Sequence, residues 1–488
     1  MNTIVLLPVL LPVIIGIGIL IGKEPKRKNY LLVITGLGLS ISATTVFYVL
    51  SLGELKFTFF NLTKELAIYY HIDGIGKIFA VIITLVWVLG GFFSFIYMKH
   101  EHKHKRYYGF YLIVFGILIS LAFSGNIITF YFFYELMTIL STPLVFHSQT
   151  KPAIMAGLKY LFYSFFGAYM VLFGIYFLFK YGTTFEFRTG GVLNSALVSG
   201  NEGILLVAAF VMILGFSVKA GMFPMHAWLP VAHPVAPAPA SAVLSGIIVK
   251  AGVLGIIRVV FFMFGADFLR GTWVQTAWIV LALITIFMGS MLAYWEKDFK
   301  KRLAYSTVSQ VSYILLGLAM LHETAFTGAM LHTICHAFVK SALFLCAGTV
   351  IFETGKKKVN ELRGIGKQMP VTMWGYTFAS LALIGIPPTS GFISKWYLAV
   401  GTLQSGMKVI SWLGPVILLI SALLTAGYLL PITINGFLPG KDYPERRKKE
   451  PAFLMWGSIC ILVCLAVGIG LLPNVVIDEI ERIAVTIF

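Results

Sequence analysis

Apolar side chains run along this chain in long blocks that short polar stretches separate. Each block holds roughly 20 apolar residues, the length that an α-helix needs to cross the hydrocarbon core of a bilayer. We count about fourteen blocks by this length. They lie near 3–22, 30–50, 74–98, 107–123, 126–147, 158–180, 203–223, 238–265, 273–294, 303–321, 325–351, 370–399, 408–437 and 452–472. The pattern predicts an all-α, polytopic membrane protein in one membrane domain.

Composition agrees with this class, because 58% of the 488 residues are hydrophobic and only 12% are charged. Such a balance excludes a soluble domain. The first block could be mistaken for a signal peptide, but the first three residues of the chain carry no basic side chain, and the basic run follows the apolar stretch. That order favours an uncleaved helix with its N-terminus outside.

The net charge of +17 would suit nucleic-acid binding, but the placement of the basic residues points to topology instead. Most Lys and Arg residues lie in connections after odd-numbered blocks, at 23–28, 99–106, 148–159, 297–302, 356–367 and 441–450. Basic connections stay in the cytoplasm, so we expect a cell-membrane protein with both termini outside. The excess charge would also attract anionic lipid headgroups. No nucleic-acid partner is expected.

Glycine and proline interrupt the seventh and twelfth blocks. The sequences are LGFSVKAGMFPMHAWLP at 214–230 and LALIGIPPTSGFISKWYL at 381–398. Carbonyls freed at such breaks need protein or water partners inside a membrane. Interrupted segments in corresponding positions of two halves indicate an internal repeat that holds a transport site.

Lys219 and Lys395 occupy matching places in these interrupted blocks, and the same offset superposes blocks four to eight on blocks nine to thirteen. A unit with an odd number of crossings must insert its second copy upside down. We therefore expect two inverted five-helix repeats. The predicted organisation is N-terminal helices at 1–106, a first repeat at 107–265, a second at 273–437 and a last helix at 438–488.

Ionisable residues inside apolar blocks are the strongest functional signal. Glu135 lies in the fifth block, where burial of a charge costs roughly 2.5–3.5 kcal/mol on insertion scales. Lys219 is its natural partner, and a change in their distance would let the lysine bind or release a proton. The structural alternative is a static ion pair that orients two helices.

Further buried cations suggest a proton relay. Lys250 lies near the centre of the eighth block, and Lys395 follows the second interruption. His332, His336 and Lys340 stand four residues apart and share one helix face. Imidazole titrates near neutrality, which suits a proton shuttle, whereas this stripe supplies too few ligands for a metal. A purely structural polar stripe is the alternative.

Three further residues are accessory candidates. His226 and His233 lie in the link between blocks seven and eight, where His226 would serve as a mouth or relay residue. Arg258 lies towards the end of block eight, where snorkelling to the membrane surface explains it as well as a function does.

Motifs for cofactor chemistry are absent from the sequence. It contains no phosphate-binding loop, no dinucleotide fingerprint and no haem-attachment motif. The four cysteines fall inside apolar blocks without a CxxC pair, so we expect neither disulfides nor an iron–sulfur cluster. We expect no cofactor, no metal and no catalytic centre in this chain.

The segments around these residues resemble a known family, the antiporter-like subunits shared by respiratory complex I, energy-converting hydrogenases and Mrp-type cation/proton antiporters. The matching segments are FFYELMTILSTPLV at 132–145, the specific stretch at 216–258, DFKKRLAYSTVSQVSYILLG at 298–317, LHTICHAFVKSALFLCAG at 331–348 and GIPPTSGFISKW at 385–396. The resemblance implies that Glu135 and Lys219 form the coupling pair and that Lys250 is the central relay. Lys395 would be the exit-side group. One complex I branch carries Glu at that position, so the resemblance leans towards the D-type subunit of Mrp antiporters or its counterpart in archaeal-type hydrogenase or sulfur-reducing complexes.

The combined interpretation is a proton-translocating subunit of a larger membrane complex, with sister antiporter-like subunits as partners. A redox partner or an ion gradient would drive it, and the sequence leaves open whether Na⁺ is exchanged. Two alternatives stay open, a self-sufficient secondary transporter and a structural scaffold whose buried charges fix helix register.

Overall fold

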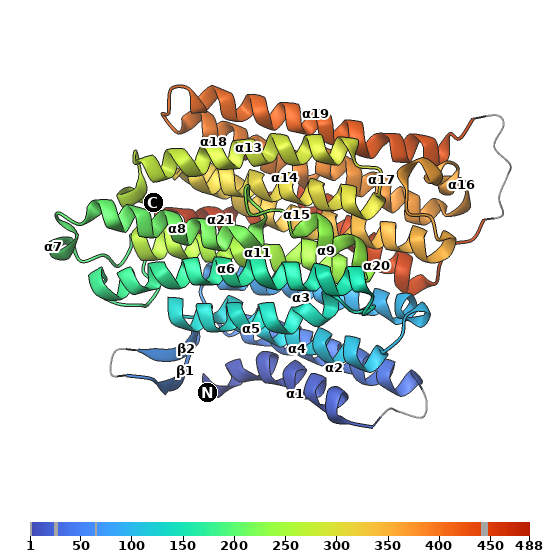
Figure 1. Cartoon of the computed structure of the whole chain (residues 1–488), viewed down its shortest axis with the longest axis horizontal. Coiled ribbons are helices and arrows are strands. Elements are labelled where there is room, and N and C mark those ends of the chain that lie inside the picture. The colour runs from blue at the N-terminus through green and yellow to red at the C-terminus, as the bar shows by residue number, and fades with distance from the viewer. Residues whose placement is uncertain (1, 24–27, 64–65, 441–447) are drawn as a thin grey trace.

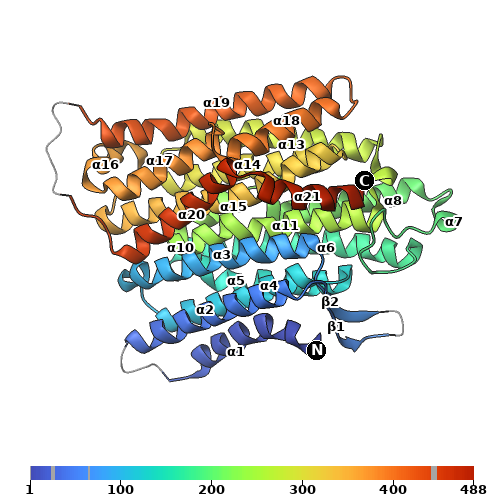
Figure 2. The same ribbon diagram turned by 180° about the vertical axis from the view of Figure 1, so that it is seen from behind.

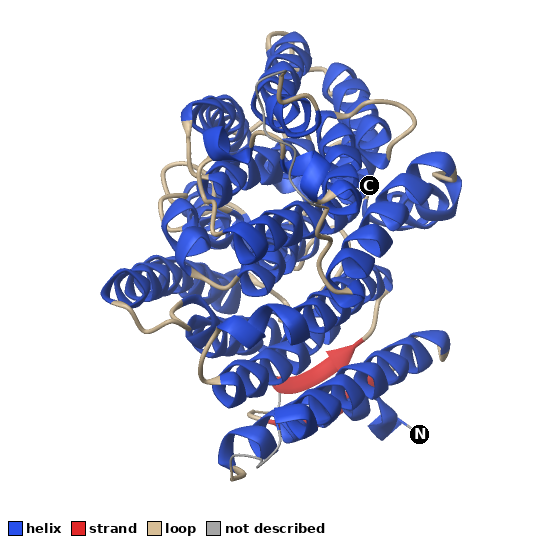
Figure 3. Cartoon of the chain, turned by 90° about the vertical axis from the view of Figure 1, so that its right-hand side faces the viewer, coloured by secondary structure: helices blue, strands red, loops and turns tan. Residues whose placement is uncertain are grey.

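The computed structural model describes residues 2–23, 28–63, 66–440 and 448–488. Nearly all of them form helices whose axes run along one direction, which is horizontal in Figure 1 and nearly end-on in Figure 3. The first half contains α1 (Leu7–Ile21), α2 (Lys28–Ser51), α3 (Gly74–Tyr97), α4 (His104–Phe123), α5 (Ile127–Val145), α6 (Lys151–Tyr181), α7 (Ser195–Val198), α8 (Glu202–Ala220), α9 (Leu229–Val235), α10 (Ala238–Val243), α11 (Val249–Ile257) and α12 (Ala266–Leu269). The second half contains α13 (Trp273–Trp295), α14 (Phe299–Ala319), α15 (Glu323–Thr354), α16 (Ile365–Gln368), α17 (Pro370–Ile384), α18 (Ser390–Gln404), α19 (Ile410–Phe437), α20 (Phe453–Leu471) and α21 (Asn474–Ile487).

Within the described residues, twelve helices are long and apolar enough to cross a membrane. The all-α, polytopic class is confirmed. The two remaining predicted blocks correspond to α14, which is rich in Ser, Thr and Gln, and to the short pair α17 and α18. These three helices lie outside the set of twelve, so the count of fourteen crossings stays a prediction.

Both predicted interruptions are present. Helix α8 ends at Gly221 with φ 78°, and α9 begins only at Leu229. Helix α17 ends at Gly385 with φ 91°, and α18 begins at Ser390. A glycine in the left-handed conformation is the common way to stop a helix, because it has no Cβ to clash.

The eighth block is irregular in a way that the sequence pattern did not predict. Two π-helical segments, η3 (Leu244–Ile248) and η4 (Arg258–Phe264), flank α11. The wider π turn displaces carbonyls from the regular ladder and recurs at functional sites. Lys250 lies two residues after the end of η3.

The count of long apolar blocks did not predict a β-hairpin and a C-terminal helix. Strands β1 (Lys56–Asn61) and β2 (Ala67–His71) form an antiparallel hairpin, which is too short for such a count. Helix α21 buries Ile477, Ile480 and Ala484 on one side and carries charged residues on the other. Its mixed polarity hides it from a search for uniformly apolar segments.

The two ends of the bundle differ in character. The N- and C-termini, the β-hairpin and α7 lie at one end, and α16, within a basic connection, lies at the other (Figures 1 and 2). This arrangement agrees with the expectation that both termini share one side of the membrane.

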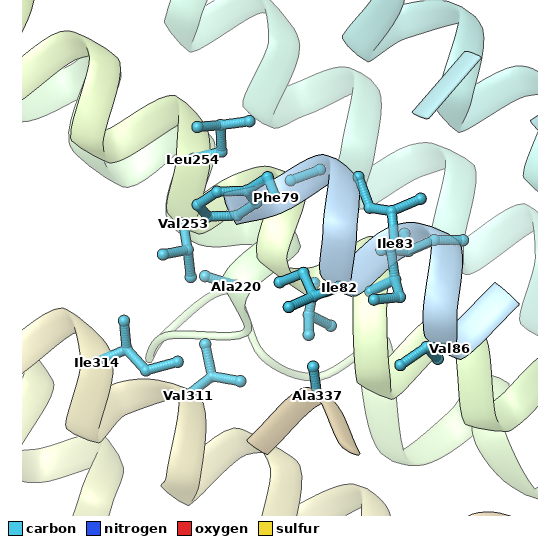
Figure 4. Packing of buried hydrophobic residues seen from close by; sticks show 14 of the residues in the cluster. Phe79, Ile82, Ile83, Val86, Ala220, Val253, Leu254, Val311, Ile314 and Ala337 are labelled. Atoms are coloured by element: carbon cyan, nitrogen blue, oxygen red, sulfur yellow. The ribbon is translucent and has the colours of Figure 1, made fainter. Parts of the chain in front are cut away.

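The centre of the bundle is formed by α15 and by the segment Ala238–Phe264, of which 94% and 100% of the most apolar window is buried. By contrast, α1, α2 and α19 are 33% buried over such windows and lie at the periphery. Figure 4 shows Phe79 and Ile82 of α3 close to Leu254 of α11, with Val311 of α14 nearby. The central helices carry most of the candidate site residues.

Candidate functional site

Lys219 lies in the last turn of α8, just before the first interruption, and is completely buried. Its Nζ donates hydrogen bonds to Tyr160 Oη at 2.6 Å and to Ser164 Oγ at 2.9 Å, both on α6. The same ammonium lies 3.9 Å from the centre of the Tyr160 ring. The carbonyl end of a helix also favours a cation. The break thus places a lysine where helix α6 satisfies its charge.

Glu135 lies on α5 and is only half-buried. Its Oε1 is buried and has no hydrogen-bond partner within the described structure. The charges of Glu135 and Lys219 act on each other, but no ion pair joins the two side chains among the described residues. The structure brings the predicted pair into one region and leaves the carboxylate free, because hydroxyls already hold the lysine.

Lys250 and the two histidines of α15 form a connected buried group. Lys250 Nζ donates to the carbonyl oxygen of Ser245 at 2.7 Å and hydrogen-bonds His336 Nδ1. The ring centres of His336 and His332 lie 6.1 Å apart, and His332 Nδ1 is 2.9 Å from Ser394 Oγ on α18. The Ser245 carbonyl belongs to the π segment η3, so the helix irregularity supplies the lysine's acceptor.

Lys395 caps the second interruption. Its Nζ donates to the carbonyl oxygens of Leu383 and Ile384 at 2.7 and 2.9 Å, at the end of α17. These are carbonyls that the break frees, so the expected need for partners is met by the lysine itself. The Tyr313 ring lies 5.0 Å from Lys395 Nζ and stacks on His332 with ring centres 5.4 Å apart. Tyr313 thus lies between the histidine stripe and Lys395.

Lys340 joins the same region indirectly. Its Nζ donates to the carbonyl oxygen of Leu303 at 3.0 Å, and that oxygen also accepts from Thr307 Oγ1 at 2.9 Å. Thr307 in turn contacts Ser245 Oγ at 2.7 Å. The polar residues of α14 therefore connect Lys340 to the residue whose carbonyl binds Lys250.

Lys219 and Lys250 are neighbours on packed helices without a direct bond between them in the described structure. Helix α11 passes α8 at Gly252, where an added Cβ would lie 2.9 Å from the Lys219 Cβ. Each ammonium points to partners of its own. A proton would need bridging water to pass from one to the other.

His233 is completely buried in α9, and neither ring nitrogen has a hydrogen-bond partner within the described structure. Its ring stacks on Phe344 with centres 4.7 Å apart. The charges that act on it are those of Lys300 and Lys340. His226, by contrast, is half-buried beside Phe223, with ring centres 6.0 Å apart, and the structure does not join it to this group.

Lys300 was missed at the sequence level, because it reads as part of the basic run at 297–302. It is 5% exposed, and its Nζ donates to the carbonyl oxygens of Ala236 and Pro234 at the end of α9. The adjacent Lys301 instead pairs with Glu296 at the surface. Only the rotation of α14 against α9 distinguishes the two lysines.

Arg258 forms an ion pair inside the protein, a contact that the sequence analysis did not predict. Its side chain is 1% exposed and forms an ion pair with Asp73, with Nη2 2.8 Å from Oδ1. The guanidinium also lies 4.7 Å from the centre of the Phe187 ring. Asp73, which the sequence analysis did not single out, accepts a bond from the Gly76 N–H at 2.8 Å and caps α3.

Within the described part of the chain, no three metal-ligating side chains gather at one place. His336 Nδ1 is occupied by Lys250, and His332 Nδ1 by Ser394. The arrangement is a set of buried cations and imidazoles that can hold and exchange protons.

A family model described as "NADH:quinone oxidoreductase/Mrp antiporter, TM" matches residues 124–425. That stretch covers more than half of the chain and holds every candidate site residue. The chain belongs to this family. The predicted resemblance to the antiporter-like subunits is thereby confirmed.

Several named proteins are similar to this chain. The N subunit of an NADH-quinone oxidoreductase from Desulforudis audaxviator is 33% identical over 72% of this chain and 69% of its own length. Hydrogenase-4 component B of Escherichia coli is 31% identical over 84% of this chain, which spans 63% of that protein. The D subunit of a Na(+)/H(+) antiporter from Alkalihalophilus pseudofirmus is 27% identical over 96% of this chain and 94% of its own length. This last match covers both chains nearly in full.

The fold of this antiporter-like chain is also that of a solved structure, the Mrp complex from Dietzia. The TM-score is 0.86 at 20% identity, over 100% of this chain and 98% of that one. A chain of an archaeal membrane-bound sulfane sulfur reductase gives a TM-score of 0.84 at 23% identity, over 99% of this chain and 97% of that one. Both neighbours are chains of multisubunit membrane complexes, which supports other membrane subunits as partners.

Proposed function

We propose that this chain is a proton-translocating, antiporter-like subunit, similar to the D-type subunit of Mrp antiporters, within a larger membrane complex. The observation that carries this proposal is the run from buried Lys250 through buried His336 and His332 to half-buried Lys395, which crosses from α11 over α15 to α18. Burying ionisable residues in a membrane protein costs free energy, so a cluster of them points to a function. Membership of the antiporter-like family also supports a role in proton translocation.

The proposed path begins at Lys219 and ends at Lys395. Lys250 hands a proton to His336, whose Nε2 is buried without a partner in the described structure and can bind a water or a proton. His332 receives it next, and Tyr313 and Ser394 connect that histidine to the second interruption. Internal water would connect Lys219 to Lys250.

The two interruptions fit the proposed repeats at 107–265 and 273–437. Each interrupted helix carries a lysine whose ammonium is held by neutral oxygens rather than by a carboxylate. A lysine held in this way changes its charge state more readily than one in an ion pair. We propose that both lysines switch in alternation, with the acid on α5 acting on the first.

The setting follows from the relatives. One is named a Na(+)/H(+) antiporter subunit and another a component of hydrogenase-4. We propose that a redox partner or an ion gradient drives proton movement here, with Na⁺ as the exchanged ion in an antiporter complex. Sister antiporter-like subunits are the proposed partners, in the cell membrane, with both termini outside.

Gentle solubilisation of the tagged chain, followed by mass spectrometry, tests the assembly. Nickel- or iron–sulfur-containing partners identify a redox-driven pump, whereas small hydrophobic subunits and further antiporter-like chains identify a cation/proton antiporter. Recovery of the chain alone, together with transport by it in liposomes, would establish a self-sufficient transporter and contradict the proposal.

Flux measurements test the mechanism. Lys219→Ala and Glu135→Ala are expected to abolish coupled proton transport in inverted vesicles while the complex still assembles. Lys180→Met removes an exposed lysine at the end of α6 and is the matched control with wild-type flux. Wild-type proton flux in either site variant would contradict a mechanism that depends on Glu135 and Lys219. Loss of assembly with normal flux in the surviving complex would favour the scaffold alternative.

A further inference from the structure

We propose that Tyr160 is a positioning residue that holds the Lys219 ammonium away from Glu135, and that its release lets the two charges pair. This inference rests on the proposed function of Lys219 and adds a residue that the sequence analysis did not single out. It concerns α5, α6 and α8, where three side chains from three helices meet.

The Lys219 ammonium is satisfied without a carboxylate. It has three N–H donors, and two of them point to hydroxyls four residues apart on α6, Tyr160 and Ser164. The face of the Tyr160 ring lies 3.9 Å from the Nζ, and an aromatic face attracts a cation. Tyr160 therefore contributes both a hydrogen-bond acceptor and a ring surface to the same charge.

The direction of the hydrogen bonds shows that Tyr160 positions the lysine rather than passing its proton on. Lysine only donates, so the Tyr160 oxygen accepts from Lys219. The Ser141 hydroxyl donates to the Thr138 carbonyl at 3.3 Å, so at the 2.8 Å contact Tyr160 donates to Ser141. The chain of donors ends at a backbone carbonyl of α5. It offers a proton no onward acceptor, but it ties α8 to α5.

Glu135 is left ready for a partner. Its buried Oε1 lacks a hydrogen bond in the described structure, and the Glu135 charge acts on Lys219. A carboxylate oxygen that is buried without a partner is costly, which favours closure of the pair. The hydroxyls of α6 oppose that closure.

The latch, formed by Tyr160 and the hydroxyls it contacts, is connected to the first interruption. The Trp228 ring, just before α9, packs on Tyr160 with ring centres 4.9 Å apart. Its indole N–H donates to the carbonyl oxygen of Val218 at 2.7 Å, one residue before Lys219. Any movement of the break between α8 and α9 therefore shifts Trp228, and with it the ring that holds the lysine.

A crosslinking experiment on the intact complex tests this inference. Dicyclohexylcarbodiimide, a lipid-soluble reagent, activates the Glu135 carboxylate, and an amide to Lys219 forms only if the amine is in direct contact. Mass spectrometry then separates the Glu135–Lys219 crosslink from the simple adduct. In Tyr160→Phe we expect roughly tenfold more crosslink than in wild type, the change that loss of a hydrogen bond to a charged group implies.

Two variants complete the design. Ser141→Ala removes the acceptor of Tyr160 without touching Lys219 and should raise the crosslink by a smaller factor, which keeps the test decisive if Tyr160→Phe fails to assemble. Tyr176→Phe, at an exposed tyrosine on the same helix, should leave it unchanged. Wild-type crosslinking in both Tyr160→Phe and Ser141→Ala would overturn the latch. Because crosslinking needs no transport, failure of the proposed function would appear separately, as normal flux in Lys219→Ala.

Discussion

Individual side chains in this protein are held by partners that lie far away in the sequence. Arg258 and Asp73 are 185 residues apart, yet they form a buried ion pair between η4 and the start of α3. Burial opposes the charge of Asp73, but the Arg258 guanidinium and the Gly76 N–H outweigh it, so the pKa of this carboxyl lies below its usual range. The pair fixes the end of the helix that carries Lys250.

We predict that Asp73→Asn destabilises the folded chain by about 3 kcal/mol or more, because it leaves Arg258 buried without a countercharge. The loss is read as a lower thermal midpoint in detergent. A double variant with Arg258→Met should recover much of it, whereas an equal loss in both would contradict the ion-pair explanation.

The wild-type pair also predicts a pH dependence. A carboxyl whose pKa is lowered in the folded state contributes stability above its unfolded value of 3.8. That contribution is lost as pH falls through the folded value. The difference in thermal midpoint between wild type and Asp73→Asn should therefore shrink as pH drops below about 4. A difference that stays constant as pH falls further below this value would contradict a charged Asp73 in the folded state.

Elements in this bundle depend on close backbone approach at the interruptions. At Gly391 in the first turn of α18, an added Cβ would meet the Ala382 carbonyl oxygen of α17 at 1.8 Å. No side chain fits there without moving one helix against the other. The glycine therefore allows α17 and α18 to overlap, which brings the Leu383 and Ile384 carbonyls to Lys395.

We predict that Gly391→Ala costs more than the 1–3 kcal/mol typical of roughly one extra methyl in a packed core, since the contact is with backbone. Reduced yield of folded complex and a lowered thermal midpoint are the expected readouts. Gly468→Ala in α20, where nothing lies within 4 Å, is the control that should behave as wild type. Equal behaviour of the two variants would contradict the packing argument.

Both termini lie at one end of the molecule, and α16, which belongs to a basic connection, lies at the other (Figure 1). Basic residues remain on the cytoplasmic side because their transfer across the bilayer is unfavourable. All connections at one end of the bundle lie on the same side of the membrane, so the orientation of one connection fixes the orientation of the others. A single labelling experiment therefore tests the whole topology.

We predict that small tags at the N- and C-termini are both accessible from outside intact cells, and that a cysteine introduced at Lys357, in a basic connection, is not. Impermeant maleimide labelling of cells and of inverted vesicles measures this in a background in which Cys335, Cys346, Cys460 and Cys464 are replaced. Labelling of the Lys357 cysteine in intact cells would reverse the assigned orientation.

The sequence alone determined the class of this protein, most of its helix positions, both interruptions and the identity of most of the buried ionisable residues. The physical reason is the bilayer, which sets the length of a spanning helix and makes charged residues rare within it. Local composition is therefore enough to locate the helices and the unusual charged residues. The hairpin was not predicted because its strands are too short, and α21 was not predicted because it carries charged residues on one side.

Only the tertiary structure decided what each charged group touches. Lys219 rests on Tyr160 rather than on Glu135, Arg258 pairs with Asp73, and Lys300 is buried whereas Lys301 is only partly buried. These contacts depend on the rotation of one helix against another, which is set by packing over many residues. A single sequence read along its length contains no direct measure of that rotation.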